Sequence, residues 1–130
     1  MPYSLHFDSG HRVLLITIGG VLTRAEYLAG YDAGMEFLAR HGPCSLISDY
    51  TGVERIDTPP GFAREISELR PLVPPGTKRV IVAPQPAIYG SARMASTLRE
   101  GTGSEIVVYR TLAEACAGLG IASPDFQPVA

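Results

Sequence analysis

Five short apolar runs are spaced so that a tight turn separates the first two and helical segments separate the later ones. The runs lie at residues 3–8, 12–18, 44–48, 80–82 and 105–109. Asp8-Ser9-Gly10-His11 is a turn sequence, so the first two runs predict an antiparallel hairpin. Strands separated by helices are joined by right-handed parallel crossovers. The chain is therefore expected to be α/β: a mixed five-stranded sheet with an N-terminal β-hairpin, parallel βα units and helices packed on it.

Four helices are expected between and after the strands. Capping boxes at Thr23-Arg24-Ala25-Glu26 and Thr111-Leu112-Ala113-Glu114 open the first helix, which runs to about His41, and the last one. The second helix is predicted to start near Asp57-Thr58-Pro59, with Asp57 or Thr58 as its cap and Pro59 in its first turn. The third follows Pro84-Gln85-Pro86 and carries Ile88, Ala92, Ala95 and Leu98 on its buried face.

The length of 130 residues suits one domain, which we place at residues 1–122, followed by a loose tail at 123–130. A net charge of -2 gives no electrostatic reason to bind nucleic acid or an anionic membrane. The longest apolar run, Val13 to Ile18, is far shorter than the roughly 20 residues of a membrane span. No targeting segment is visible, and we expect a cytoplasmic protein.

The sequence holds two cysteines, Cys44 and Cys116, both in apolar contexts. We expect two buried thiols, with a single disulfide as the alternative. The phosphate-binding loop, the dinucleotide glycine fingerprint, the serine nucleophile elbow and the zinc-helix motif are all absent from the sequence. We therefore expect no cofactor, no metal site and no catalytic residue set.

Polar side chains gather where the third and fourth strands are expected to end. In a parallel sheet the carboxyl ends of the strands form one rim, where α/β proteins bind ligands. Tyr89 and Arg93 are one helical turn apart, which fits a clamp for a carboxylate or phosphate, or else Arg93 pairs with a surface acid. The predicted rim for a ligand or partner consists of Asp49, Tyr50, Thr51, Tyr89 and Arg93, with Gln85 nearby.

Asp57 and Thr58 are candidates for an anion or phosphorylation site. A hydroxyl at a helix N-terminus lies where free backbone N–H groups favour a phosphate. The alternative is that these residues only cap the helix. Asp49 and Asp57 are also a candidate acid–base pair, with turn-forming roles as the alternative.

Three segments carry a family resemblance. They are Ile18-Gly19-Gly20-Val21-Leu22-Thr23, the run from Ser48 to Thr58, and Leu112-Ala113-Glu114-Ala115. With these segments and the order β-β-α-β-α-β-α-β-α, residues 3 to 121 resemble the STAS or SpoIIAA-like family, which includes anti-sigma factor antagonists and stand-alone bacterial proteins. The resemblance implies that Thr58, preceded by Asp57, matches the family's phosphorylatable residue. This chain differs from the regulatory members in placing Pro59-Pro60 directly afterwards.

Three hypotheses about function follow. The first is a non-enzymatic STAS-like binding or regulatory domain that acts through protein contacts or a small ligand at the rim. The second is a binder of a small apolar or lipid-like ligand. The third is an enzyme that uses Asp49 or Asp57 with Arg93. Gly30 and Gly34 predict a close contact with the sheet or with a second subunit, which leaves a homodimer open.

Overall fold

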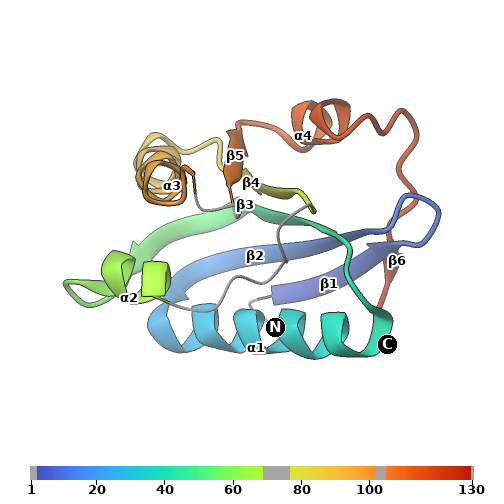
Figure 1. Ribbon diagram of the computed structural model, residues 1–130. Coiled ribbons are helices and arrows are strands. Elements are labelled where there is room, and N and C mark those ends of the chain that lie inside the picture. Colours follow the sequence, from blue (N-terminus) through green and yellow to red (C-terminus); the bar gives the residue numbers. More distant parts are fainter. Residues whose placement is uncertain (1–2, 69–76, 102–104, 130) are drawn as a thin grey trace.

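The computed structural model describes residues 3–68, 77–101 and 105–129, which form a mixed sheet with helices on both faces (Figure 1). The elements are β1 (Tyr3–Asp8), β2 (Val13–Thr23), α1 (Arg24–His41), β3 (Ser45–Asp57), α2 (Phe62–Glu68), β4 (Arg79–Val82), α3 (Pro86–Leu98), β5 (Ile106–Tyr109), α4 (Leu112–Gly118) and β6 (Gln127–Pro128). The strand order is β5-β4-β3-β2-β1-β6. Strands β2 to β5 are parallel, and β1 is antiparallel to both of its neighbours. The predicted α/β class and N-terminal hairpin are confirmed.

The sheet has six strands among the described residues, whereas the sequence predicted five. The additional strand, β6, comes from the tail that was expected to be loose. It pairs with His6 and Phe7 of β1, and the backbone N–H of Val129 donates to the carbonyl of Leu5 at 2.9 Å. A two-residue strand that contains a proline has no periodicity to detect. Its pairing depends on the open edge of β1, which is a tertiary feature.

Strands β2 and β3 extend much further than predicted. The prediction ended β2 at Ile18, before Gly19-Gly20, and ended β3 at Ser48. Instead the two strands stay paired to Thr23 and Asp57, with register shifts near the glycines. Gly19 lies opposite Gly52, and a Cβ built on Gly19 would lie 3.6 Å from the Gly52 carbonyl oxygen. The glycines permit bulges, through which the ladder continues instead of ending.

The N-termini of α1 and α4 are as predicted, and that of α2 is not. The side chains of Thr23 and Thr111 accept hydrogen bonds from the backbone of Glu26 and Glu114 at 3.2 and 3.1 Å. The second helix, by contrast, begins at Phe62 and not near residues 57–59. Asp57 and Thr58 therefore do not cap α2, because the strand β3 continues to Asp57.

Two apolar clusters lie on opposite faces of the sheet. One contains side chains of α1 and α3 together with Leu14, Leu46 and Ile81 of the strands. The other contains side chains of α4 with Ile47, Val80 and Val82. Strand alternation explains this division, since successive side chains of β3 and β4 point to opposite faces. Figure 1 shows α1 and α4 on opposite sides of the sheet.

The cysteines and the helix glycines lie inside the chain's own core. Cys44 and Cys116 are free thiols in different clusters, so the expectation of two buried thiols is confirmed. Burial raises the pKa of both thiols. Gly30 and Gly34 are buried, and a Cβ on Gly30 would lie 3.9 Å from the Tyr3 ring of β1. The sequence analysis predicted that these glycines contact either the sheet or a second subunit. For Gly30 the structure shows a contact with the sheet.

Candidate functional site

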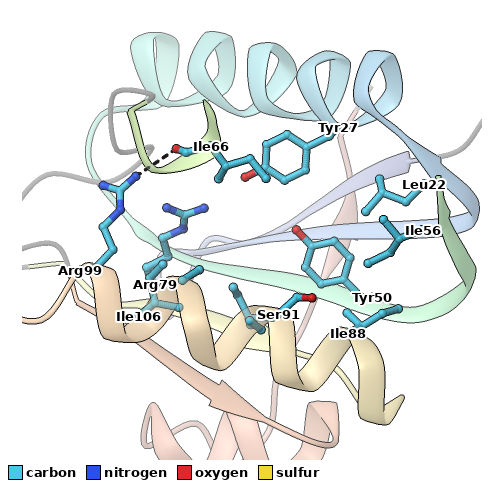
Figure 2. Close-up of a pocket in the computed structure, with 13 residues that line it drawn as sticks. Leu22, Tyr27, Tyr50, Ile56, Ile66, Arg79, Ile88, Ser91, Arg99 and Ile106 are labelled. Carbon is cyan, nitrogen blue, oxygen red and sulfur yellow. Dashed lines mark hydrogen bonds between the residues drawn. The ribbon is translucent and has the colours of Figure 1, made fainter. Parts of the chain in front are cut away.

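An apolar pocket of about 110 Å³ lies between one face of the sheet and helices α1, α2 and α3 (Figure 2). Its walls combine aliphatic side chains, two tyrosines, a serine and two arginines. The lining residues are Leu22, Tyr27, Tyr50, Ile56, Ile66, Arg79, Ile81, Ile88, Ser91, Ala92, Ala95, Arg99 and Ile106.

The regular periods of strand and helix bring these side chains to one place. Arg79 and Ile81 are two residues apart in β4 and so face the same side of the sheet. On α3, residues Ile88, Ala92 and Arg99 fall on one stripe, because eleven residues make about three helical turns. The sequence analysis placed Leu98 on this stripe, but Leu98 is 56% exposed and Arg99 is 9% exposed. That prediction was wrong by one residue, or about 100° of helix rotation.

Helix α2 closes one side of the pocket and is held against α1. The rings of Tyr27 and Phe62 meet edge to face with centroids 5.4 Å apart. Arg24 of α1 also forms a two-pronged ion pair with Glu65, with an Nη2–Oε2 distance of 2.6 Å and an Nε–Oε1 distance of 3.0 Å. This hydrogen-bonded pairing lowers the pKa of Glu65 and raises that of Arg24. The contacts set the position of Ile66 in the pocket wall.

The two arginines give one end of the pocket a positive charge. Arg79 is 8% exposed, and its Nε–H is buried with no hydrogen-bond partner. Arg99 donates from Nη2 to the carbonyl of Ile66 at 3.4 Å, the dashed line in Figure 2. Burial lowers the pKa of Arg99, and the nearby charge of Arg79 lowers it further. Both cations lie at the same end of the pocket in Figure 2, where their like charges disfavour one another.

Of the residues predicted for the rim and the anion site, Tyr50 lines this pocket. Burial raises the pKa of Tyr50, with a smaller contribution in the same direction from Tyr27, and Arg79 opposes the shift. The Tyr50 phenol is therefore neutral at physiological pH and acts in the pocket as an apolar ring with a polar tip. Tyr50 lies within the strand β3 and not on a loop, and its contact with a ligand stays a prediction.

Asp49 and Thr51 lie at the bulge of β3 and hydrogen-bond to each other. The Asp49 Oδ1 accepts from the backbone N–H of Thr51 at 2.9 Å and from its hydroxyl at 2.5 Å. Asp57 is exposed at the end of the same strand, 3.9 Å from Arg55. Eight residues of extended strand separate Asp49 from Asp57, which corresponds to roughly 25 Å. The structure does not bring them together as an acid–base pair.

Gln85 supports the bulge of β3. Its side-chain Nε2 donates to the carbonyls of Tyr50, Thr51 and Val53 at 2.9, 3.1 and 2.8 Å. Bulges leave ladder groups unpaired, and buried carbonyls need a donor. Gln85 therefore holds the backbone that positions Tyr50. The sequence analysis placed Gln85 near the rim but could not predict this role, because it depends on contacts with a distant strand.

Tyr89, Arg93 and Thr58 lie outside the pocket lining. The ring of Tyr89 is stacked by the guanidinium of Arg110, 4.2 Å from the ring centroid, and no such contact is seen with Arg93 among the described residues. Arg93 is exposed on α3. Thr58 precedes α2 by four residues, so helix N–H groups do not surround it in this structure. Phosphorylation of Thr58 stays a prediction.

The sequence analysis did not identify Arg79 and Arg99 as pocket residues, although the periodicity of the strand and of the helix places both on the core face. Arg79 precedes Ile81 by two residues, so strand alternation puts it on the core face with Ile81. Arg99 follows Ile88 by three full helical turns. Neither was among the candidate residues of the sequence analysis, and arginine is rarely buried without a partner.

Within residues 3–68, 77–101 and 105–129, no group of three His, Cys, Asp or Glu side chains is arranged to hold a metal ion. Over the same residues, no helix has the length and apolar character needed to cross a membrane.

Two solved structures share the architecture of this chain. One is the anti-sigma factor antagonist SpoIIAA in its unphosphorylated form, with a TM-score of 0.59 and 13% identity over 91% of this chain and 97% of that one. The other is an uncharacterized protein of the DUF3478 family with a SpoIIAA-like fold from Shewanella loihica PV-4, with a TM-score of 0.57 and 17% identity over 90% and 91% of the two chains. No protein-family model and no curated protein matches the chain. The order of strands and helices and these two likenesses show that the chain has the SpoIIAA-like, STAS-type fold.

Proposed function

We propose that this protein is a non-enzymatic binding domain that takes a small, mainly apolar ligand into the pocket between the sheet and α1, α2 and α3. The observation that carries the proposal is the pocket itself, a cavity of about 110 Å³ walled by aliphatic and aromatic side chains. Protein interiors are close-packed, and voids larger than a water molecule are few. An apolar cavity with a few convergent polar groups is the usual form of a small-molecule site.

The size of the cavity supports a ligand that places a few non-hydrogen atoms inside it and extends outward. It holds several times the roughly 30 Å³ of a water molecule in the liquid, and its walls offer water few hydrogen bonds. Ile56 in the pocket wall is 38% exposed, so this part of the wall lies at the protein surface. A chain-like ligand fits this shape better than a compact polar one.

Filling the pocket is expected to abolish binding. The change is Ala95→Phe on α3, where Ala95 lines the cavity. With octanamide as a neutral probe, isothermal titration calorimetry should show binding to the wild-type chain and a loss of about tenfold or more in the variant, because the new ring occupies the apolar volume. The matched control is Ala87→Phe, on the same helix but exposed and outside the lining. Equal binding by both variants would contradict the proposed function, and so would a wild-type chain that binds neither octanamide nor the corresponding acid, octanoate.

Regulation through protein contacts is a second candidate function. The structurally similar SpoIIAA is an anti-sigma factor antagonist, and its fold is that of this chain. Met94 and Leu98, one turn apart on α3, are 61% and 56% exposed and together offer an apolar contact surface. Further candidate contacts are the remaining rim and phosphorylation residues Asp49, Thr51, Asp57, Thr58, Tyr89 and Arg93.

A second copy of the chain is the simplest partner for the exposed apolar face of α3. Light scattering at increasing protein concentration should then show a dimer, and Leu98→Glu should shift the equilibrium toward the monomer by about tenfold, because it places a charge in an apolar contact. The exposed position Ala113→Glu on α4 is the control. A monomer at all concentrations would contradict the homodimer.

A further inference from the structure

We propose that the pocket takes an anionic amphiphile, namely a carboxylate on an apolar chain, whose carboxylate binds Arg79 while its chain lies along Leu22, Ile56 and Ile88. This inference rests on the proposed function, because it uses the same pocket. It adds the ligand's charge, its orientation and the residue that recognises it.

The burial of Arg79 is the first observation. Arg79 is 8% exposed at the first position of β4, on the side of the sheet that faces the pocket, and its Nε–H has no hydrogen-bond partner. Among the described residues, no carboxylate oxygen lies within 4.0 Å of its guanidinium. A buried guanidinium keeps its proton, and leaving its Nε–H without an acceptor is costly. A bound carboxylate would accept from this Nε–H and from a neighbouring Nη–H in the two-pronged geometry that arginine favours.

A second cation lies at the same end of the pocket. Arg99 also lines the pocket, and Arg79 lowers its pKa, so the two side chains interact electrostatically. Figure 2 shows both guanidinium groups at one end, and Leu22, Ile56 and Ile88 toward the other. An anion bound at the arginine end relieves the repulsion between the two cations, which a neutral ligand cannot do.

The arrangement also fixes the direction of the ligand. The arginine end is the buried one, with Arg79 and Arg99 8% and 9% exposed, whereas Ile56 at the other end is 38% exposed. The charged group therefore enters first, and the apolar chain follows toward the surface. Charge at the buried end and apolar walls at the open end favour an acid over a neutral apolar molecule.

Glu26 is the one acid that borders Arg79 through a cavity among the described residues. It lines an adjoining cavity of about 20 Å³ together with Arg79, and its Oε2 is buried without a hydrogen-bond partner. Glu26 and Arg79 form no direct ion pair. If Arg79 served only to balance Glu26 across this cavity, the pocket would not distinguish an acid from its neutral amide.

The test compares octanoate with octanamide, which share a chain and differ in charge. At pH 7 the full-length chain should bind octanoate about tenfold more tightly than octanamide, as expected for a buried charge-assisted pair. Arg79→Met should remove this preference and leave octanamide binding within about twofold, while Arg79→Lys should keep part of it. Arg40→Met, at an exposed arginine on α1 far from the pocket lining, should match the wild type. Titration calorimetry measures all of these.

The outcomes separate this inference from the proposed function. Equal affinity of the wild type for the two probes, or an octanoate preference that persists in Arg79→Met, would overturn the anion site while the pocket remains a ligand site. Binding of neither probe would overturn both. Thermal unfolding shows whether Arg79→Met is folded, and Arg79→Gln serves as a second variant if it is not. The affinities of the wild type for octanoate and octanamide test the preference for an anion without any variant.

Discussion

Truncation of Leu46 to alanine is expected to lower the free energy of unfolding by about 2–5 kcal/mol. Leu46 lies in β3, in the middle of the sheet, and is 0% exposed. It packs within the cluster that α1 and α3 cover. Removing its branched end loses the transfer free energy of the deleted atoms and leaves a cavity that a paired central strand cannot collapse to fill.

The matched control is Val107→Ala on β5. Val107 is 49% exposed, and surface substitutions usually change stability by less than about 0.5 kcal/mol. Urea denaturation followed by circular dichroism gives the unfolding free energies of both variants. Similar losses at the two positions would show that β3 is not the centre of the folded core, contrary to the strand order described above.

The substitution Asp8→Ala is expected to cost about 3 kcal/mol. Asp8 is 2% exposed at the end of β1 and accepts three hydrogen bonds. They come from the backbone N–H of His11 at 2.9 Å, the His11 ring at 2.8 Å and the backbone N–H of Asp125 at 2.9 Å. The carboxylate thus joins the β1–β2 turn to the C-terminal segment that leads to β6. Without it, buried donors lose their acceptor and the segment at Asp125 loses an anchor.

Asp32→Ala, at an exposed position of α1, is the control and should stay within about 0.5 kcal/mol of the wild type. Hydrogen exchange adds a local readout, because the amide of Val129 donates to Leu5 in the β1–β6 pairing. Its protection should fall in Asp8→Ala and not in Asp32→Ala. Unchanged protection would mean that β6 docks without Asp8.

The Asp8 carboxylate also makes the free energy of unfolding depend on pH. Burial alone raises the pKa of Asp8, but the hydrogen bonds from Asp125 and His11 outweigh it, so that the pKa lies below its usual value. The unfolded chain then binds the proton more readily than the folded one. The stabilisation is complete above the ordinary carboxyl pKa, about 3.9, and is lost as the pH falls through the lower folded value. Asp8→Asn should flatten this acid limb of the stability curve, while a slope equal to that of the wild type would contradict the role of Asp8.

The sequence analysis placed Tyr50 in a rim for a ligand or partner, and the structure places Tyr50 in the pocket lining. The sequence analysis gave no indication of which charged side chains are buried. Asp49, Thr51 and Asp57 were expected on a loop, but β3 continues through them because Gly19 and Gly52 allow the two backbones to stay close. Hydrogen bonds across a bulge depend on the partner strand, and no local pattern in residues 48–57 contains that information.

The sequence by itself determined the alternation of strands and helices, the hairpin, two helix caps and the α/β class, because these depend on short-range periodicity and on side chains within four residues of each other. The tertiary structure alone decided that the tail pairs with β1, that β2 and β3 run on together, and that Arg79 and Arg99 meet at the end of an apolar pocket. The physical reason is that an arginine's environment is set by residues distant in the chain, here from β3, α1 and α2. Strand alternation and helical spacing place Arg79 and Arg99 on the core face, but whether a charge on that face is buried depends on the layers packed over it.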